Sequence, residues 1–390
     1  MNLIEKEQKY ILQTYKRYPI VVEYAQGTRI YDKDGNEYLD FLAGIAVNLL
    51  GHSHPKVIQA IENQIRRYMH LSNYFYQDVQ IELAERILKL SGYSKVFFTN
   101  SGTEANEGAL KIVRRWGNRM GKKTVIAFTG GFHGRTYGAL SLMDKPHYKE
   151  LMYPFLNGVE IVPFNDVNAL KNTINYDTAG VFIEFIQGEG GISEANKQFI
   201  QELWDLKQKH NFLVVADEVQ SGIFRTGKLF AFQHWGVIPD IVTIAKGFGG
   251  GLPLGGILVS SELEHIFEKG MHGTTFGGNA VSCAAGIANL EVIFPGLIGH
   301  INFVSDYLDG TLKKIMQEFP EKIVEVRGRG LMRGLVLDFE AIILVEKLLE
   351  ERIITNATSR NVLRLVPPLI ITNQDVDLFY NGLKNALQKI

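Results

Sequence analysis

The middle of the chain alternates short, continuously apolar runs with longer runs whose apolar residues recur at helical spacing. Lys95 to Thr99 is such an apolar run, and Thr103 to Trp116 then places Ala105 and Ile112 on one helical stripe. Lys197 to His210 has a similar helical pattern. The other predicted strands are Val125 to Phe128, Val181 to Phe185, Phe212 to Ala216, Ile241 to Ala245 and Ile257 to Ser260. Because apolar strands that alternate with helices are typical of parallel sheets covered on both faces, the pattern predicts an α/β fold with a mainly parallel sheet.

The pattern changes towards both ends of the chain. After a long helical run, Lys322 to Phe339 alternates apolar and polar residues like a pair of antiparallel strands, and the C-terminus is helical again. Near the N-terminus, YDKDGNEYLDF predicts a hairpin with Asp34-Gly35 as its turn. The 390 residues therefore predict a large domain over residues 51–294 and a small α+β domain built from residues 1–50 and 295–390.

Composition and charge give no reason to expect a nucleic-acid or membrane partner. The 41 lysine and arginine residues nearly balance 42 aspartate and glutamate residues, so no positive excess favours nucleic acid or an anionic membrane. No stretch approaches the roughly 20 apolar residues of a membrane span, and the charged start, MNLIEKEQKYIL, lacks a signal-peptide core. The single cysteine, Cys283, fits a reducing compartment. We therefore expect a cytoplasmic protein.

Candidate ligand-binding residues follow the predicted strands, at the edge where parallel sheets bind ligands. After the first strand, Asn100-Ser101-Gly102-Thr103 opens directly into a helix. The free N–H groups and the dipole of a helix start favour an anion, and Gly102 permits close approach. Ser101 and Glu104 also have the spacing of a capping box, so a plain helix cap explains this motif at least as well.

The second predicted strand runs into a glycine-rich loop that contains an aromatic ring and a cation. Phe132, between glycines in Gly130 to Arg135, is placed to stack on a flat ring. Arg135 is suited to fork onto a carboxylate. The alternative is a glycine loop whose phenylalanine packs in the core and whose arginine forms a surface ion pair.

Two ionisable residues stand at the ends of the fourth and fifth predicted strands. Asp217 ends an apolar run, and a buried carboxylate needs a partner, for which a protonated pyridine nitrogen or a salt bridge within the fold would serve. Lys246 ends the next run and enters a glycine cluster. Desolvation lowers the pKa of a buried lysine and frees its amine to form a Schiff base, unless the side chain reaches water instead. Together the four strand ends supply the parts that a pyridoxal 5′-phosphate (PLP) site needs.

At these residues the chain resembles the class III (ω-amino acid) PLP-dependent aminotransferases, and the likeness runs nearly from end to end. The motifs that carry it are GHSHP at Gly51–Pro55, SGTEANE, GGFHGRT, IQGEGG, DEVQSG, the lysine of AKG, TTFGGN at Thr274–Asn279 and VLR at Val362–Arg364. The resemblance implies PLP-transferase fold type I, with a seven-stranded sheet between helices in the large domain. Within the class, FLAGIAVNLLGHSHP, PFND and VLRLVPPL are most similar to the acetylornithine aminotransferase branch.

The resemblance implies a role for five residues around the cofactor ring. Lys246 would carry the cofactor as a Schiff base and then transfer protons. Asp217 would keep the ring nitrogen protonated, which makes the ring an electron sink. Phe132 and Val219 would pack on its two faces, and Gln220 would lie near its phenolic oxygen.

The resemblance also implies how the phosphate group is held. Gly102 and Thr103 would bind it at the start of their helix. Thr275 would complete the phosphate site from the partner subunit, so that the active enzyme would be a homodimer with shared active sites.

Four further residues would bind the substrates. The resemblance implies that Arg135 and Thr274 contact the amino donor, Arg135 through its α-carboxylate. Arg364 would bind the α-carboxylate of 2-oxoglutarate or glutamate, and Glu189 would pair with Arg364 while the donor is bound. The expected reaction moves the δ-amino group of N2-acetylornithine to 2-oxoglutarate, as in arginine biosynthesis, and needs no metal.

Several alternatives stay open. Gly44, where the ornithine branch tends to carry tyrosine, leaves room for an acylated α-nitrogen or simply bends the backbone. Succinyl-diaminopimelate, ornithine and 4-aminobutyrate are alternative donors, and a mutase or racemase of the same fold is another possibility. A nucleotide-binding oxidoreductase would need G-x-G-x-x-G after a first strand, which is missing. A non-catalytic binding protein is disfavoured because Lys246 and Asp217 are both present.

Overall fold

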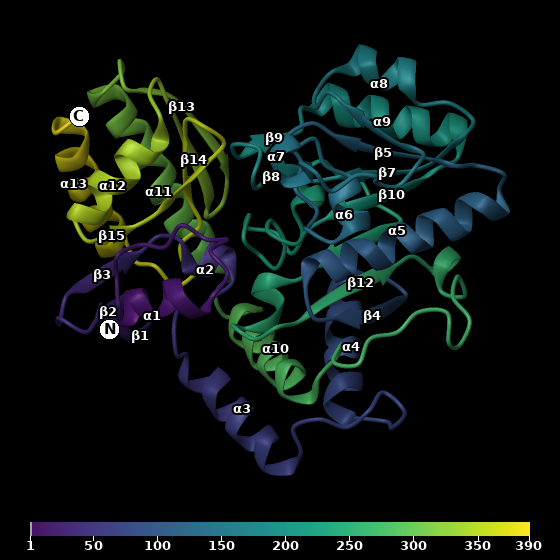
Figure 1. Ribbon diagram of the computed structural model, residues 1–390, viewed down its shortest axis with the longest axis horizontal. Coiled ribbons are helices and arrows are strands. Elements are labelled where there is room, and N and C mark those ends of the chain that lie inside the picture. Colours follow the sequence, from purple (N-terminus) through teal and green to yellow (C-terminus); the bar gives the residue numbers. More distant parts are fainter. Residues whose placement is uncertain (1) are drawn as a thin grey trace.

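The centre of the molecule is a seven-stranded sheet. A computed structural model describes residues 2–390 and places these strands in the order β4-β12-β11-β10-β7-β5-β6 (Figure 1). They are β4 (Lys95–Thr99), β5 (Thr124–Phe128), β6 (Val159–Val162), β7 (Thr178–Ile183), β10 (Leu213–Asp217), β11 (Ile241–Ile244) and β12 (Gly255–Val259). Strand β12 is antiparallel to both of its neighbours, and the other pairings are parallel. The predicted α/β class and the mainly parallel sheet are confirmed.

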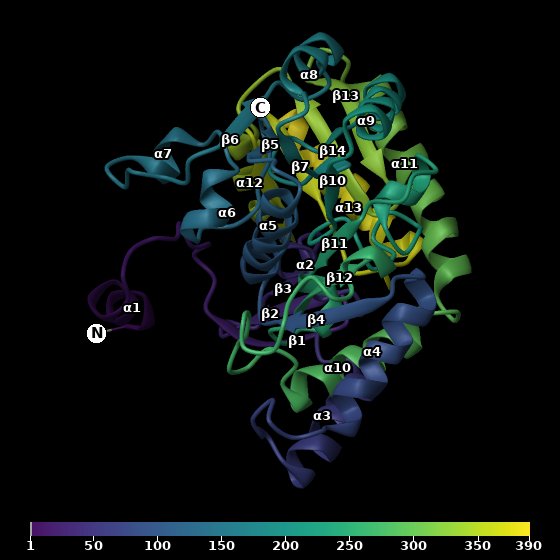
Figure 2. The same ribbon diagram turned by 90° about the vertical axis from the view of Figure 1, so that its right-hand side faces the viewer.

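Successive residues of each central strand face opposite sides of the sheet and build two apolar clusters. Ile126 belongs to one cluster and its neighbour Val125 to the other. Helix α5 (Gly102–Arg119) covers the Val125 side, whereas α8 (Val167–Thr173) and α9 (Lys197–His210) cover the Ile126 side (Figures 1 and 2). Helix α9 has the predicted bounds, and α5 extends beyond its predicted bounds at both ends. The carboxyl ends of the parallel strands are thereby held between two rigid layers.

The first and last parts of the chain form two smaller sheets, one of which contains strands from both parts. One contains β1 (Val22–Gln26), β2 (Arg29–Asp32), β3 (Glu37–Asp40) and β15 (Ile353–Ile354); the other contains β13 (Ile323–Arg329), β14 (Met332–Leu337), β16 (Asn356–Thr358) and β17 (Val362–Leu365). The predicted hairpin is present, since Asp32 Oδ1 accepts the N–H groups of Asp34 and Asn36 and Gly35 has φ +81°. Strand β15 pairs in parallel with β3, so the N-terminal strands lie beside the C-terminal segment (Figure 1).

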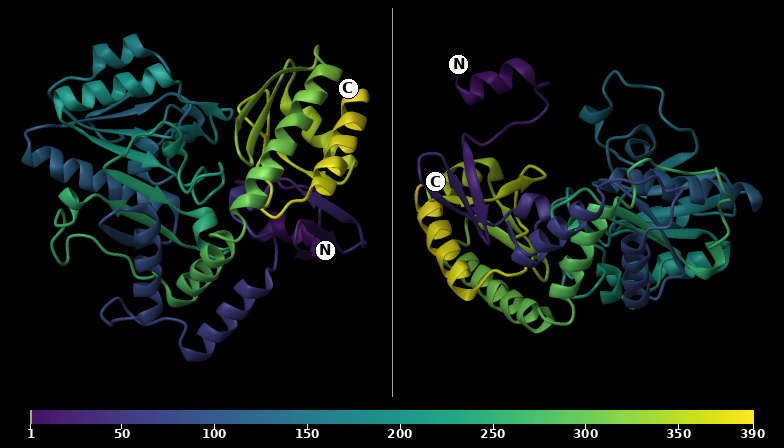
Figure 3. Two further views of the ribbon diagram at one scale, coloured as in Figure 1. Left: turned by 180° about the vertical axis from the view of Figure 1, so that it is seen from behind. Right: turned by 90° about the horizontal axis from the view of Figure 1, so that it is seen from below.

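The remaining helices connect or cover these sheets. They are α1 (Leu3–Tyr10), α2 (Ala43–Ala46), α3 (Pro55–Arg67), α4 (Asp78–Ser91), α6 (Tyr137–Ser141), α7 (Pro146–Lys149), α10 (Ala280–Ile293), α11 (Ile298–Glu318), α12 (Ala341–Glu350) and α13 (Asn373–Gln388), with a short β8–β9 ladder at Ile186–Gln187 and Ser193–Glu194. Helix α1 has no buried residue and projects from the body (Figure 3). Within residues 2–390 no single helix is long and apolar enough to cross a membrane; α10 and α11 meet that test only together, with a 72° bend.

Candidate active site

A cavity of about 700 Å³ opens at the carboxyl ends of the parallel strands. Its wall is built from strand ends, from the segment around Gly44 and from the C-terminal strand β17. Most of the predicted site residues line it: Gly102, Thr103, Phe132, Arg135, Glu189, Asp217, Val219, Gln220, Lys246 and Arg364. Residues separated by more than 200 positions in sequence are therefore brought together around one space, as expected for an α/β sheet.

Asp217 is the buried acid of this cavity, and it is held by three donors. Its Oδ2 lies 2.7 Å from Asn106 Nδ2 and 2.8 Å from His133 Nδ1, and its Oδ1 accepts the N–H of Val219. Asn106 is itself oriented by the hydroxyl of Thr243, which donates to Asn106 Oδ1 at 2.8 Å. From the sequence, the partner of Asp217 was either a residue within the fold or the nitrogen of a ligand. His133 is a partner within the fold, and the Asp217 carboxylate still faces the cavity.

Lys246 provides an amine at the end of β11, on the first residue of a 3₁₀ turn. Its φ is +47°, an uncommon conformation for a residue with a side chain, of the kind that clusters at functional sites. Burial lowers the pKa of Lys246, although the nearby carboxylate of Glu189 acts in the opposite direction. Among residues 2–390 no side chain forms a hydrogen bond or ion pair with its ammonium group. This amine is thus free to react.

Arg364 is fully buried and holds a carboxylate at the cavity wall. Its Nη1 contacts Glu189 Oε1 and lies 3.1 Å from Gln220 Oε1, and its Nε donates to Asn356 Oδ1 at 3.1 Å. Burial opposes the ionisation of Glu189, but the charge and hydrogen bond of Arg364 outweigh it and hold the pKa of Glu189 below its usual value. The guanidinium of Arg364 and the carboxylate of Glu189 therefore face each other at the cavity wall.

The N-terminus of α5 forms another part of the wall. Ser101 Oγ accepts the N–H of Glu104, but the Glu104 carboxylate bonds to Asn100 instead of returning to Ser101, so only half of the predicted capping box forms. A Cβ on Gly102 would lie 2.6 Å from Val219 Cγ1, which explains why a residue without a side chain occupies this position. The first N–H groups of a helix have no partner within it, so this end remains available to an anion.

Phe132 and Arg135 lie together at the mouth of the cavity. The Arg135 guanidinium is 5.8 Å from the Phe132 ring centre and 4.8 Å from that of Tyr148. Such cation–π contacts position the guanidinium without neutralising its charge. Arg135 is exposed and keeps its hydrogen-bonding fork available to a carboxylate.

Thr274 and Thr275 are the predicted site residues that do not line this cavity. Thr274 Oγ1 accepts from Nδ2 of Asn100, a lining residue, at 3.1 Å, and Thr275 is exposed. Neither threonine therefore reaches the cavity that contains Lys246 of its own chain.

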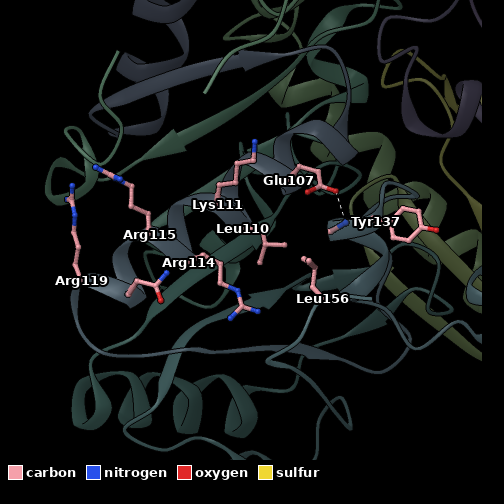
Figure 4. A pocket seen from close by; sticks show the side chains of 10 residues that line it. Glu107, Leu110, Lys111, Arg114, Arg115, Arg119, Tyr137 and Leu156 are labelled. Atoms are coloured by element: carbon pink, nitrogen blue, oxygen red, sulfur yellow. Dashed lines mark hydrogen bonds between the residues drawn. The ribbon is translucent and has the colours of Figure 1, made fainter. Parts of the chain in front are cut away.

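A second cavity, of about 820 Å³, lies on the outer face of α5, with Lys111, Arg114, Arg115 and Arg119 around it (Figure 4). Arg114 already donates to the carbonyl of Gly158 at 3.1 Å. Arg115 donates to the Ile266 carbonyl and pairs with Glu268 at 2.9 Å. The lining of this second cavity comes from α5, from the start of α6 and from Leu156, and includes no strand end. The cavity that contains Lys246 is therefore the candidate active site.

Comparison with known proteins agrees with this geometry. The family model for class-III aminotransferases matches residues 10–387. The chain belongs to this family. It is 43% identical to the acetylornithine aminotransferase of Methanocaldococcus jannaschii, over all of this chain and 98% of the relative, and 44% identical to that of Caldanaerobacter subterraneus subsp. tengcongensis, over the whole of both.

Solved structures of this aminotransferase family have the same fold. The ornithine aminotransferase from Toxoplasma gondii ME49 is 30% identical with a TM-score of 0.94, covering 99% of this chain and 95% of that one. The N-acetylornithine aminotransferase from Stenotrophomonas maltophilia K279a is 34% identical with a TM-score of 0.85, covering 99% of both. The expectation of an aminotransferase of class III is confirmed.

The residues of the cavity fit PLP, the cofactor that this family implies. The fit rests on the chemistry of the donor set: an uncommitted amine on Lys246, an ionisable acid on Asp217 and a helix start at Gly102 that offers N–H groups. Gly134, at φ +131°, lets the loop approach Thr103, because a Cβ there would lie 2.1 Å from Thr103 Oγ1. The same cavity holds a ring face at Phe132.

Three buried residues of the cavity of this aminotransferase were not predicted from the sequence, and two of them, Asn106 and His133, orient Asp217. His133, Asn106 and Glu184 all line the cavity, and none was assigned a role. Burial raises the pKa of Glu184 to about 7, and its two oxygens accept the N–H groups of Phe132 and Gly188. His133 lies inside a quoted motif and Asn106 lies one helical turn after Gly102, which are the signals that spacing offered.

Proposed function

We propose that this aminotransferase moves the δ-amino group of N2-acetylornithine to 2-oxoglutarate, giving N-acetylglutamate 5-semialdehyde and glutamate, with PLP as its cofactor. The observation that carries the exchange is the Arg364–Glu189 pair beside Lys246. A carboxylate that neutralises Arg364 suits an amino donor that presents no carboxylate there. When Glu189 turns away, the same guanidinium suits the α-carboxylate of 2-oxoglutarate.

The proposed mechanism assigns one task to each residue of the cavity. PLP, when bound, draws electrons from the carbon that carries the amino group. Lys246 would remove a proton from that carbon and return it one step later, a task that burial favours because it lowers the pKa of the Lys246 amine. Asp217 would supply the negative charge for the cofactor's ring nitrogen, and His133 fixes the orientation of Asp217. Gly102 and Thr103 would hold the phosphate at the start of α5.

The donor assignment rests on relatives and on one residue. Proteins named acetylornithine aminotransferase match the chain end to end at 43% and 44% identity. The solved ornithine aminotransferase has a TM-score of 0.94 to this chain and the solved N-acetylornithine aminotransferase one of 0.85. Similarity of fold therefore does not distinguish between these two donors. Gly44 lines the cavity, and a Cβ there would lie 3.3 Å from Asn48 Nδ2. A larger side chain at this position would take the space that we assign to the acetyl group.

The test is an absorption titration of the purified holoenzyme with N-acetylornithine, in the absence of 2-oxoglutarate. We expect the cofactor's visible band to bleach and to return when 2-oxoglutarate is added. A band that ignores N-acetylornithine but responds to ornithine, 4-aminobutyrate or succinyl-diaminopimelate would replace the proposed donor. Lys246→Ala is the control, because it should give no turnover with any donor.

We also propose a homodimer with shared active sites, in which Thr275 completes the phosphate site of the partner subunit. The proposal is supported by the exposure of Thr275 and by the nearly complete exposure of Tyr74 and Tyr76, at 94% and 99%. Large exposed apolar side chains often mark an interface. We further propose the division at residues 51 and 295, supported by the pairing of β15 with β3, and a cytoplasmic location, supported by the free Cys283.

A further inference from the structure

The segment between β3 and the GHSHP motif contains one turn of left-handed helix. The φ angles of its four residues, Ala43, Gly44, Ile45 and Ala46, are +50, +64, +65 and +60°. Residues with a Cβ avoid this region, because the Cβ approaches the following carbonyl oxygen, and a β-branched residue such as Ile45 is a marked exception. Such a backbone persists only where its surroundings hold it.

One buried carboxylate holds the entry to this turn. Asp40, at the end of β3, is 1% exposed, and its Oδ1 accepts the N–H groups of Leu42 at 2.8 Å and Ala43 at 2.9 Å. Its second oxygen, Oδ2, lies 2.7 Å from His52 Nε2. Both oxygens of Asp40 are therefore occupied, one by the turn and the other by the imidazole.

His52 connects the entry of the turn to its exit. Its Nδ1 lies 3.4 Å from Nδ2 of Asn48, two residues after the turn, in a geometry that suits an imidazole with its proton on Nε2. The backbone of His52 pairs with Gly27 through hydrogen bonds of 2.8 and 2.9 Å. Gly51 is required beside it, because a Cβ there would lie 2.3 Å from the Gly27 carbonyl oxygen. The backbone pairing with Gly27 thus holds His52 in place, and its imidazole links Asp40, before the turn, to Asn48, after it.

The turn forms a wall of the active site. Gly44, Ile45 and Val47 line the cavity that contains the reactive lysine. Leu49, just beyond the turn, packs against Gly247, where a Cβ would lie 2.6 Å from Leu49 Cδ1. A relaxed turn would move this wall, whereas the hydrogen bonds of Arg364 and Asp217 are made with residues outside the turn.

We propose that Asp40 and His52 are positioning residues that hold the left-handed turn and thereby determine which amino donor the cavity accepts. The inference rests on the proposed function, because it assigns the acylated end of the donor to the Gly44 side. 2-Oxoglutarate is smaller and depends on Arg364, so its binding is less sensitive to the turn. Donor and acceptor should therefore respond differently when the pair is broken.

The test compares three holoenzyme variants in steady-state kinetics. Asp40→Ala removes both contacts, whereas Asp40→Asn keeps an acceptor for the two N–H groups. Arg29→Met is the matched control, because Arg29 lies in β2 of the same sheet and its ion pairs, with Asp375 of α13 at 2.7 Å and with Glu37 at 2.8 Å, do not involve the turn. We expect Asp40→Ala to raise the KM for N-acetylornithine about tenfold and that for 2-oxoglutarate less than about twofold. In Asp40→Asn most of the increase in the KM for N-acetylornithine should be absent.

Hydrogen exchange supplies a readout that is independent of turnover. We expect the amides of residues 41–50 to exchange faster in Asp40→Ala than in the wild type, while Arg29→Met leaves this segment unchanged. The proposal is overturned if both KM values rise together, if the segment keeps its protection, or if Arg29→Met gives the same kinetic difference. Failure of the proposed function would instead appear in the wild type, as no turnover of N-acetylornithine, and the exchange experiment would still test the turn.

Discussion

Nδ1 of His133 lies 2.8 Å from Oδ2 of Asp217, and both side chains are buried. Burial opposes protonation of His133, but the hydrogen bond and the charge of Asp217 raise the pKa of His133 above its usual value. The histidine therefore supplies a donor that fixes the orientation of the Asp217 carboxylate. An ionised carboxylate is the partner that a protonated ring nitrogen needs.

Removing the charge of Asp217 should cost most of the activity. Asp217→Asn preserves the shape of the side chain, so we expect the rate of the donor half-reaction to fall by at least about a hundredfold, as for loss of a group that acts in the transition state. His133→Gln should cost less, because the charge remains while its orientation is lost. Stopped-flow measurement of the donor half-reaction checks both, and a rate within twofold of the wild type for Asp217→Asn would contradict the assignment.

Glu184 should make the stability of the enzyme depend on pH. Burial raises the pKa of Glu184 to about 7 from its ordinary value of 4.5, so the folded state binds more protons than the unfolded state between these values. The stability that this carboxyl contributes is complete below pH 4.5 and is lost as the pH rises through 7.

Glu184→Gln should remove this dependence. Between about pH 5 and about pH 8 we expect the free energy of unfolding to fall less in the variant than in the wild type. The two decreases should differ by at most about 3 kcal/mol. Urea denaturation of holoenzyme at both pH values measures the difference. Glu160→Gln, at an exposed position of β6, is the control and should keep the wild-type slope. Equal slopes in wild type and Glu184→Gln would show that the carboxyl is not protonated in the folded state.

The sequence predicted the strand ends well, because continuous apolar runs fix where buried strands stop. Asp217 and Lys246 both lie at the cavity where their strands end. It did not predict the edge strand β6, since only Val162 of its four residues is buried and no apolar run marks it. The left-handed turn at Gly44 was foreseen only as a bend, because the contacts of Asp40 and His52 that hold it come from tertiary structure.

The Arg364–Glu189 pair should separate the two half-reactions. In Glu189→Gln the guanidinium lacks its counter-charge and attracts the donor's own carboxylate, which misplaces the reacting amine. We expect kcat/KM for N-acetylornithine to fall about tenfold while the KM for 2-oxoglutarate falls or stays unchanged. Glu194→Gln, which breaks the remote Arg329–Glu194 pair, is the control. Equal losses for both substrates would contradict the exchange of partners.

Thr275 offers a direct test of shared active sites. In this chain it is exposed and lies outside the cavity that contains Lys246. If Thr275 acts across a subunit interface, its loss impairs the active site that contains the partner's lysine. The site that contains Lys246 of the same chain then depends on the threonine of the partner chain. Lys246→Ala, by contrast, disables the site of its own chain.

Mixing these two variants should therefore restore activity. A heterodimer of Lys246→Ala and Thr275→Ala would contain one site with both residues intact and one with neither. After unfolding and refolding an equal mixture with PLP, random pairing predicts about a quarter of the wild-type activity per chain. Each variant refolded alone, at the same concentration, is the control. Activity no greater than the mean of the two controls would show that Thr275 serves its own chain or no active site at all.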